Sequence, residues 1–268
     1  MGDTIKIAKV MLHHWEEPCI SGEKGSGAIF FSGCSLRCVY CQNCDISHQG
    51  HGRDYTADEL ANAMLDLQSQ GAHNINLVTP THYGDKIRQA LDLIKDRLKI
   101  PVVYNTSGYE LDTEIEKMAG YVDVFLTDMK YFSPEHSRKY SQAGDYYNVA
   151  KSALLAMLKI APKCEFDENG IMQKGVIIRH LVLPTLRRDS IALLTDLAGS
   201  IDVGAVKLSL MAQYTPEFCT SGYPELLRKI TTFEYDSVVK SATELGFDGY
   251  IQDKSASSVQ YTPKFLED

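Results

Sequence analysis

The chain has 268 residues, of which 44% are hydrophobic and 23% charged, so it can bury a sizeable core and does not have the composition of a disordered protein. Its formal net charge of −8 argues against a broad nucleic-acid-binding surface, which is normally basic. It contains no run of about 18 apolar residues, so we expect no membrane-spanning helix. The first residues lack the basic-then-apolar pattern of a secretion signal, and we therefore expect a cytoplasmic protein.

Six short runs rich in β-branched and aromatic residues are predicted to be strands. They are almost continuously apolar, which is typical of parallel strands buried on both faces. In chain order they are AIFFSG (28–33), NINLVTP (74–80), PVVYNTSG (101–108), VDVFLTDMK (122–130), GVIIRHLVLP (175–184) and AVKLSLM (205–211).

Helical patterns lie between these runs. Thr56 and Glu59 form a T-x-x-E capping box ahead of LANAMLDLQSQ, and Gly71 ends that helix. Further helices are predicted over 85–98, 146–160 and 224–245.

Strands that alternate with helices predict a parallel sheet with right-handed crossovers. Six units are fewer than the eight of a closed TIM barrel, so the predicted fold class is α/β, with a partial, splayed (β/α)6 TIM-like barrel. We predict one domain over 1–268, with a core at about 26–212. An N-terminal extension over 1–25, without clear pattern, is expected to pack over one end. A C-terminal helix and extended tail are expected over 223–268, and the final extended segment, 246–268, is expected to lie across the barrel or its mouth.

Four of the seven cysteines lie in GCSLRCVYCQNC (33–44), directly after the first predicted strand. Cys34, Cys38 and Cys41 have the spacing C-x3-C-x2-C, and thiolates this close in one loop can all bind one iron–sulfur cluster. In a reducing compartment such a group indicates metal or redox chemistry before disulfides. Three thiolates on a four-iron cluster leave one iron without a protein ligand, which is the open position that a reactive metal site needs.

The spacing alone leaves two alternatives open. A structural zinc site commonly uses two C-x2-C pairs separated by a longer stretch, whereas these thiols are crowded together. The other alternative is a closed cluster that only transfers electrons.

The pattern Cys34-x3-Cys38-x-Tyr40-Cys41 resembles the motif of the radical S-adenosylmethionine (radical SAM) superfamily. The longer string GSGAIFFSGCSLRCVYCQN is similar to the activating enzymes of glycyl radical enzymes, particularly the pyruvate formate-lyase activating type. With HHWEEPCISGEKGSG before it, the chain looks most similar to a poorly characterised branch of that type. The resemblance covers about 13–253 and is strongest at the cysteines.

The resemblance implies that Cys34, Cys38 and Cys41 hold a [4Fe-4S] cluster, whose fourth iron binds the amino and carboxylate groups of S-adenosylmethionine. One electron would then cleave this cofactor to methionine and a 5′-deoxyadenosyl radical, which abstracts hydrogen from the substrate. The implied substrate is a glycine of a partner glycyl radical enzyme, and the implied electron donor is reduced flavodoxin or a ferredoxin-type protein. The alternatives are a small-molecule or peptide substrate and, in another class, a non-catalytic iron–sulfur or zinc-binding module.

The remaining cysteines and the aromatic residue of the motif are interpreted on the same basis. Tyr40 is expected to contact the adenine, while also packing as an ordinary aromatic side chain. The family gives Cys44 no role, and we expect it to be a bystander, with a redox or alternative-ligand role as the alternative. Cys19, Cys164 and Cys219 have no ligand spacing and are interpreted as buried thiols.

The second predicted strand ends in NLVTPTHYG, where the family usually has a Gly-Gly-Glu motif that binds the amino group of S-adenosylmethionine. Thr79 and Thr81 stand there instead, and their oxygens can accept from an amino group, but this strand end offers no acidic residue. His82 is a candidate active-site residue, with a surface or capping histidine as the alternative.

The third strand ends in YNTSG, which aligns Asn105, Thr106 and Ser107 with residues that surround the cofactor's carboxylate. The fourth ends in LTDMK, and its Asp128 and Lys130 share one face of the strand. They are candidates to bind ribose hydroxyls, a monovalent cation or the cofactor carboxylate, and a plain salt bridge is the alternative. In the pyruvate formate-lyase type a monovalent cation lies near two aspartates, one of which Asn105 replaces.

The fifth strand carries IIRHLVLP, in which Arg179 corresponds to a family arginine near the cofactor. A guanidinium suits a carboxylate or a ribose, and strand alternation directs His180 to the opposite face. The sixth strand continues as SLMAQYTP, and Gln213 stands where the family has a histidine near adenine or ribose. Tyr214 is either a substrate-side residue or part of the core.

Overall fold

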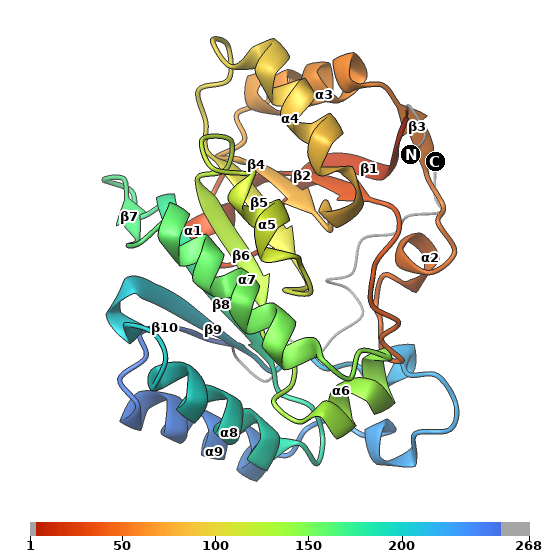
Figure 1. The fold of residues 1–268 in the computed structure, drawn as a ribbon, viewed down its shortest axis with the longest axis vertical. Helices are drawn as coiled ribbons and strands as arrows, with labels where there is room; N and C mark the ends of the chain where they lie inside the picture. Colours follow the sequence, from red (N-terminus) through yellow and green to blue (C-terminus); the bar gives the residue numbers. More distant parts are fainter. Residues whose placement is uncertain (1–3, 253–268) are drawn as a thin grey trace.

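The computed structural model describes residues 4–252, whose strands form one mostly parallel sheet flanked by helices (Figure 1). The strands are β1 (Ile5–His13), β2 (Ser26–Phe31), β3 (Arg53–Tyr55), β4 (Ile75–Val78), β5 (Val102–Thr106), β6 (Val124–Asp128), β7 (Glu165–Phe166), β8 (Met172–Leu181), β9 (Val206–Met211) and β10 (Gly249–Ile251). The α-helices are α1 (Pro18–Ser21), α2 (Cys44–Ser47), α3 (Ala57–Ser69), α4 (Gly84–Ile94), α5 (Asp112–Glu116), α6 (Pro134–Ser141), α7 (Tyr146–Ile160), α8 (Arg187–Ala198) and α9 (Thr232–Glu244). The 3₁₀ helices are η1 (Thr81–Tyr83), η2 (Val203–Ala205), η3 (Pro216–Phe218) and η4 (Pro224–Leu226).

The strand order confirms the predicted partial barrel. It runs β10-β9-β8-β6-β5-β4-β2-β1-β3, and β7 pairs only with β8. All neighbours from β2 to β10 are parallel, and they include the six predicted strands. Within the described residues β3 and β10 are the two ends of this order, so the sheet is open rather than closed. The helices pack in pairs, with α3 against α4, α5 against α7 and α8 against α9.

The predicted helices are present, but two of them differ at one end, and α4 stops at Ile94, before the predicted end at 98. The capping box of α3 is present, with the Thr56 hydroxyl accepting from the Glu59 amide at 3.2 Å. The prediction over 146–160 matches α7. The helix predicted over 224–245 is wrong at its start: η4 is a separate turn, and α9 begins only after Thr231. Thr231 and Glu234 form a second capping box, which sets the first turn of α9 there.

The N-terminal extension contains a strand that its sequence did not indicate. β1 pairs antiparallel with β2, and the register shifts between Ile7 and Lys9. Such a bulge interrupts the two-residue alternation by which a half-buried strand is recognised. The following helix α1 places Cys19 and Ile20 in a buried cluster with Val103 and Val124, so this part of the extension packs on the sheet.

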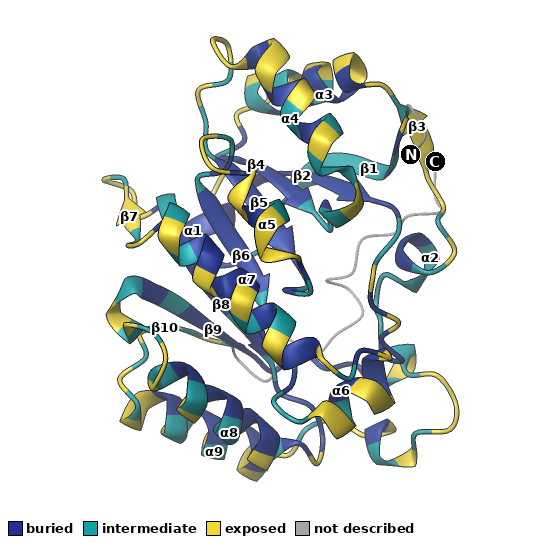
Figure 2. Ribbon diagram, viewed as in Figure 1, coloured by how far each residue is buried: buried dark blue, intermediate teal, exposed yellow. Residues whose placement is uncertain are grey.

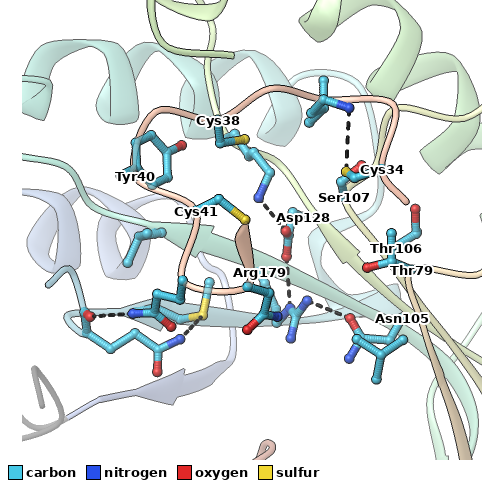
Figure 3. Close-up of a pocket in the computed structure, with 18 of the residues that line it drawn as sticks. Cys34, Cys38, Tyr40, Cys41, Thr79, Asn105, Thr106, Ser107, Asp128 and Arg179 are labelled. Atoms are coloured by element: carbon cyan, nitrogen blue, oxygen red, sulfur yellow. Dashed lines mark hydrogen bonds and ion pairs between the residues drawn. The ribbon is translucent and has the colours of Figure 1, made fainter. Parts of the chain in front are cut away.

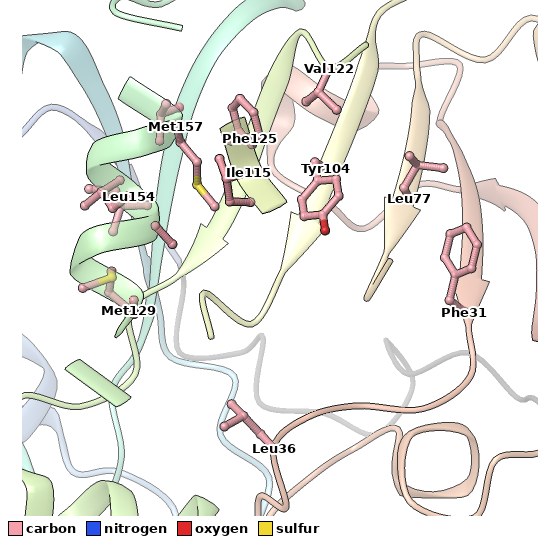
Figure 4. Packing of buried hydrophobic residues seen from close by; sticks show 14 of the residues in the cluster. Phe31, Leu36, Leu77, Tyr104, Ile115, Val122, Phe125, Met129, Leu154 and Met157 are labelled. Atoms are coloured by element: carbon pink, nitrogen blue, oxygen red, sulfur yellow. The ribbon is translucent and has the colours of Figure 1, made fainter. Parts of the chain in front are cut away.

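The core lies between the sheet and the helices, and burial follows this layering (Figure 2). β2 and β5 are buried along their whole length, as parallel strands covered on both faces should be. On the helix side, Tyr104 and Phe125 of the sheet pack in one cluster with Leu154 and Met157 of α7 (Figure 4). The opposite side of the same strands carries the polar side chains described below.

The C-terminal part is described only as far as Gln252. The short β10 extends the sheet beside β9. The tail segment predicted to lie across the barrel mouth falls largely in 253–268, outside the described residues. Within 4–252 we find no helix with the length and apolar character needed to cross a membrane.

Candidate functional site

A cavity of about 270 Å³ lies where the segment 33–44, called the cysteine loop below, meets the carboxyl ends of the parallel strands (Figure 3). This is the end at which barrels of this type carry their chemistry. Most residues singled out in the sequence line it: Cys34, Cys38, Tyr40, Cys41, Thr79, Asn105, Thr106, Ser107, Asp128, Lys130, Arg179, Gln213 and Tyr214. Thr81 and His82 do not, and neither does Cys44.

Each of the three spaced thiols has a hydrogen-bonding partner in the surrounding structure. The Leu36 amide donates to Cys34 Sγ at 3.4 Å. The Ser141 hydroxyl of α6 donates to Cys38 Sγ at 3.1 Å. Cys41 Sγ lies 3.1 Å from the Ser47 hydroxyl of α2. Hydrogen bonds to ligand sulfurs are a principal means by which proteins adjust the potential of iron–sulfur clusters.

The donor set fits an iron–sulfur cluster better than a single metal ion. All seven cysteines are free thiols, and burial raises the pKa of Cys34, Cys38 and Cys41, the last to about 12. Among residues 4–252, no three His, Cys, Asp or Glu side chains converge closely enough to bind one metal ion. Cluster thiolates bind different iron atoms and need not converge on one point.

A chain of buried hydroxyl groups leads from the cavity wall to one of these thiols. The Tyr40 and Tyr131 hydroxyls are 2.5 Å apart, and Tyr131 is 2.8 Å from the Ser141 hydroxyl that donates to Cys38. Tyr40 also makes an edge contact with the ring of Tyr214, with ring centroids 6.0 Å apart. Tyr40 therefore both lines the cavity and packs as an aromatic residue.

Alternating charges form the polar wall of the cavity (Figure 3). Asp128 accepts from Lys130 Nζ at 2.5 Å through one oxygen and from Arg179 Nε at 2.9 Å through the other. Arg179 Nη2 also donates to Asn105 Oδ1 at 2.6 Å. Burial disfavours the ionised form of Asp128, but Arg179 and Lys130 outweigh it and hold its pKa below the usual value.

Strand alternation separates Arg179 from its neighbour as predicted. The ring of His180 faces the helices, with Nδ1 at 2.6 Å from the Met129 carbonyl and Nε2 at 2.8 Å from the Ser190 hydroxyl of α8. Burial lowers the pKa of His180, so it is held as a neutral imidazole in the core.

The turn after β5 brings backbone and side chain close to the cavity. Gly108 has φ +80°, and a Cβ built on it would lie 2.2 Å from the Asp128 carbonyl oxygen, so this position requires glycine. The Ser107 hydroxyl lines the cavity, is shielded from solvent and has no hydrogen-bond partner among residues 4–252. An unpaired buried hydroxyl in a cavity wall is suited to a polar ligand group.

The end of β4 divides its candidates between the cavity and the protein interior. Thr79 lines the cavity with a left-handed φ of 58°, an uncommon conformation for threonine. Thr81 turns away and donates to Glu110 Oε1 at 2.6 Å. His82 is exposed at the surface, which agrees with the alternative interpretation of this residue.

The last candidates lie at the sixth strand and in the thiols outside the motif. Gln213 lines the cavity, and its Oε1 accepts from Gln252 Nε2 at 3.5 Å. Tyr214 is buried and donates to the Leu226 carbonyl at 2.7 Å, so it belongs to the core as well as to the cavity wall. Cys44 begins α2, with its sulfur 3.9 Å from Asp45 Oδ1.

Several cavity residues were missed from the sequence. His13, Trp15 and Glu16 come from the end of β1 and the loop after it. The polar and aromatic composition of HHWEEP was the available signal, but β1 runs antiparallel to β2 and ends beside its first residue, Ser26, so the rule of the carboxyl ends did not point to this segment. Ser141 was missed because no local pattern links α6 to the cysteine loop.

The sequence is similar to a family model and to known proteins. The model of the radical SAM superfamily matches residues 28–172, which is more than half of the chain. An uncharacterized protein of Methanocaldococcus jannaschii is 29% identical over 233 residues, covering 83% of this chain and 63% of that protein. The pyruvate formate-lyase-activating enzyme of Clostridium pasteurianum is 27% identical over 164 residues, covering 59% of this chain and 62% of that enzyme. The chain thus spans less than two thirds of the length of these relatives.

Solved structures resemble the chain in fold. SuiB of Streptococcus suis, bound to the precursor peptide SuiA, has a TM-score of 0.55 at 16% identity, covering 82% of this chain and 47% of SuiB. HydG, a maturase of the [FeFe]-hydrogenase, has a TM-score of 0.56 at 15% identity, covering 82% of this chain and 49% of HydG. At these identities the likeness concerns the fold alone.

Proposed function

Because the chain belongs to the radical SAM superfamily, we propose that it uses its cysteine loop to generate a radical that activates a partner glycyl radical enzyme. Membership of the superfamily implies a [4Fe-4S] cluster and S-adenosylmethionine. The observation that carries the proposal is the meeting of three free thiols and a charged polar wall in one cavity. Cys34, Cys38 and Cys41 are the proposed ligands of the cluster.

When bound, the two cofactors supply reductive cleavage of S-adenosylmethionine to methionine and a 5′-deoxyadenosyl radical. The protein's part is to bind, orient and exclude water. Lys130 offers an ammonium group to the cofactor carboxylate, and Asp128 and Arg179 hold each other in place beside it. Asn105 and the unpaired Ser107 hydroxyl are proposed further contacts of the cofactor's amino acid part. A monovalent cation beside Asp128 stays a prediction.

The adenosine part is assigned to the other side of the cavity. Tyr40 and Gln213 line that side, and we assign them to the adenine and ribose. Thr79 contributes a wall at the end of β4. Apolar side chains complete the enclosure, namely Phe30, Leu36, Leu181 and Met211. Such walls keep water and side reactions away from a reactive intermediate.

A polypeptide glycine is the proposed substrate. The similarity to the Clostridium pasteurianum activating enzyme supports this class of substrate. Trp15 lines the cavity and is 63% exposed, so part of the cavity wall is an aromatic surface that a partner can contact. Aromatic residues of this kind are enriched where proteins contact one another.

The proposal is tested with a glycyl radical enzyme whose gene neighbours that of this chain. The reconstituted chain, S-adenosylmethionine and reduced flavodoxin are incubated with that enzyme, and a glycyl radical is sought by electron paramagnetic resonance. We expect a radical signal that is lost with the Cys34→Ala variant. Formation of 5′-deoxyadenosine with a peptide or small molecule, and no glycyl radical, would transfer the activity to the alternative substrate class.

A further inference from the structure

Glu16 is a carboxylate in the cavity that comes from outside the parallel-strand core. It lies in the loop between β1 and α1, before the residues 28–172 that match the superfamily. It lines the same cavity as the three thiols, and its side chain is 11% exposed. Carboxylates are almost never buried to this extent without a charged partner or a ligand.

Two amide groups fix the orientation of Glu16. Its Oε1 accepts from Asn76 Nδ2 of β4 at 3.1 Å and from Asn105 Nδ2 of β5 at 3.2 Å. Its Oε2 accepts from Arg179 Nη1 of β8 at 3.3 Å. The carboxylate is therefore held across three strands, between Asn76 within β4 and the Arg179 guanidinium of the polar wall.

The charge of Glu16 is less well compensated than that of Asp128. Lys130 and Arg179 contact Asp128 at 2.5 and 2.9 Å. Within 4–252, Glu16 has one ion pair, a longer contact of 3.3 Å with Arg179. Burial raises the pKa of Glu16 despite Arg179, while the pKa of Asp128 is lowered. A buried carboxylate in this position is stabilised by a further positively charged or N–H donating group.

We propose that the Glu16 carboxylate accepts a hydrogen bond from the amino group of S-adenosylmethionine. Glu16 would thus supply, from the N-terminal segment, the acidic residue that the end of β4 lacks. This inference rests on the proposed function, because it presumes that the cavity binds this cofactor. The division of charge agrees with it: Glu16 receives the amino group, and Lys130 at the other side of Asp128 receives the carboxylate. Asn105 connects Glu16 to the charged wall of the cavity, since its side-chain amide contacts both Glu16 and Arg179.

The test compares two ligands in two proteins. Binding of S-adenosylmethionine and of its analogue without the α-amino group is measured by calorimetry, anaerobically and without reductant, on the cluster-loaded wild type and Glu16→Gln. The amino group's contact with iron contributes equally in both proteins and cancels in the comparison. We expect the preference for the amino-bearing ligand to fall by about 10-fold or more in Glu16→Gln, as for loss of a charged hydrogen bond.

Controls separate this role from others. Glu17→Gln makes the same substitution at the neighbouring residue, which is buried but does not line the cavity, and should keep the wild-type preference. The inference would be overturned if Glu16→Gln weakened the binding of both ligands equally. It would also be overturned if Glu17→Gln changed the preference as much as Glu16→Gln does. If Glu16→Gln does not fold, Glu16→Asp, which keeps the charge on a shorter arm, takes its place and should show a smaller loss. A wild type that binds neither ligand would contradict the proposed function itself.

Discussion

At the scale of single residues, four neighbouring thiols have different surroundings. The sulfurs of Cys34, Cys38 and Cys41 face the cavity with hydrogen-bonding partners from three different segments. Cys44 begins α2 outside the cavity lining. Local sequence sets the first three apart as the proposed ligands, because their spacing is itself the signal.

This difference predicts the outcome of single substitutions. Cys34→Ala, Cys38→Ala and Cys41→Ala should each lose the cluster's iron and reduce 5′-deoxyadenosine formation to background, because each removes one of three ligands. Cys44→Ala should keep about four irons per chain and most of the activity. Iron content and product are measured after anaerobic reconstitution, and loss of both in Cys44→Ala would show that the fourth thiol is also a ligand.

Glu110 predicts a pH dependence of stability. Burial raises its pKa from 4.5 to about 7, against hydrogen bonds from Thr81 and Thr106, and Glu114 adds to the rise. The folded protein thus binds this proton more tightly than the unfolded chain does. The stability that this bound proton contributes to the folded state is fully present below about pH 4.5 and is lost as the pH rises through about 7.

In Glu110→Gln the free energy of unfolding should therefore decrease less steeply with pH, between about pH 4.5 and 7, than in the wild type. Urea unfolding at several pH values measures this slope. Glu116→Gln, which changes an exposed carboxylate of α5, should keep the wild-type slope. Equal slopes in wild type and Glu110→Gln would contradict the assignment.

At the scale of elements, α6 contacts the cysteine loop through the backbone carbonyls of Tyr140 and Ser141, which accept from the Val39 and Arg37 amides, and through the Ser141 hydroxyl. Ser141 donates to Cys38 and is itself joined to Tyr131 and Tyr40, and a donor to a ligand sulfur stabilises the more negative, reduced state of a cluster. Ser141→Ala should lower the cluster's reduction potential by on the order of 50 mV, the equivalent of about 1 kcal/mol for one electron. Ser137→Ala, in the same helix but bonded to Pro134, should leave it unchanged. A redox titration measures both, and equal potentials in wild type and Ser141→Ala would contradict this role.

The turn after β5 predicts a stability difference between two glycines. Gly108→Ala should destabilise the protein by about 2–4 kcal/mol, because its Cβ would meet the Asp128 carbonyl. Gly120 has a similar φ of +83° but no atom near its Cβ position, so Gly120→Ala should cost only the conformational term of about 1–2 kcal/mol. Chemical denaturation of both variants decides this, and equal losses would argue against the close backbone approach.

The elements themselves could be predicted to different degrees. The six parallel strands were recognisable because strands buried on both faces are continuously apolar, and α3 because its capping box is local. β1 was not, because its bulge interrupts the alternation. The start of α9 was misplaced because the apolar pattern continued through η4, whereas the second capping box decided the boundary.

At the scale of the whole molecule, the site joins segments far apart in the chain. The strand order brings the ends of β4, β5, β6 and β8 side by side, so their polar residues could be expected to meet. The contributions of Glu16 and Ser141 could not, because they depend on how the loop after β1 and the end of α6 pack on that sheet. Thr81, assigned to the site by its position, turns instead toward Glu110.

The most direct test of the account is reductive cleavage of S-adenosylmethionine by the reconstituted chain. After anaerobic loading with iron and sulfide and reduction with dithionite, S-adenosylmethionine is added, and electron paramagnetic resonance and product chromatography follow. The account predicts a cluster signal that changes on adding S-adenosylmethionine, with methionine and 5′-deoxyadenosine formed in equal amounts. An unchanged signal together with no 5′-deoxyadenosine would contradict it.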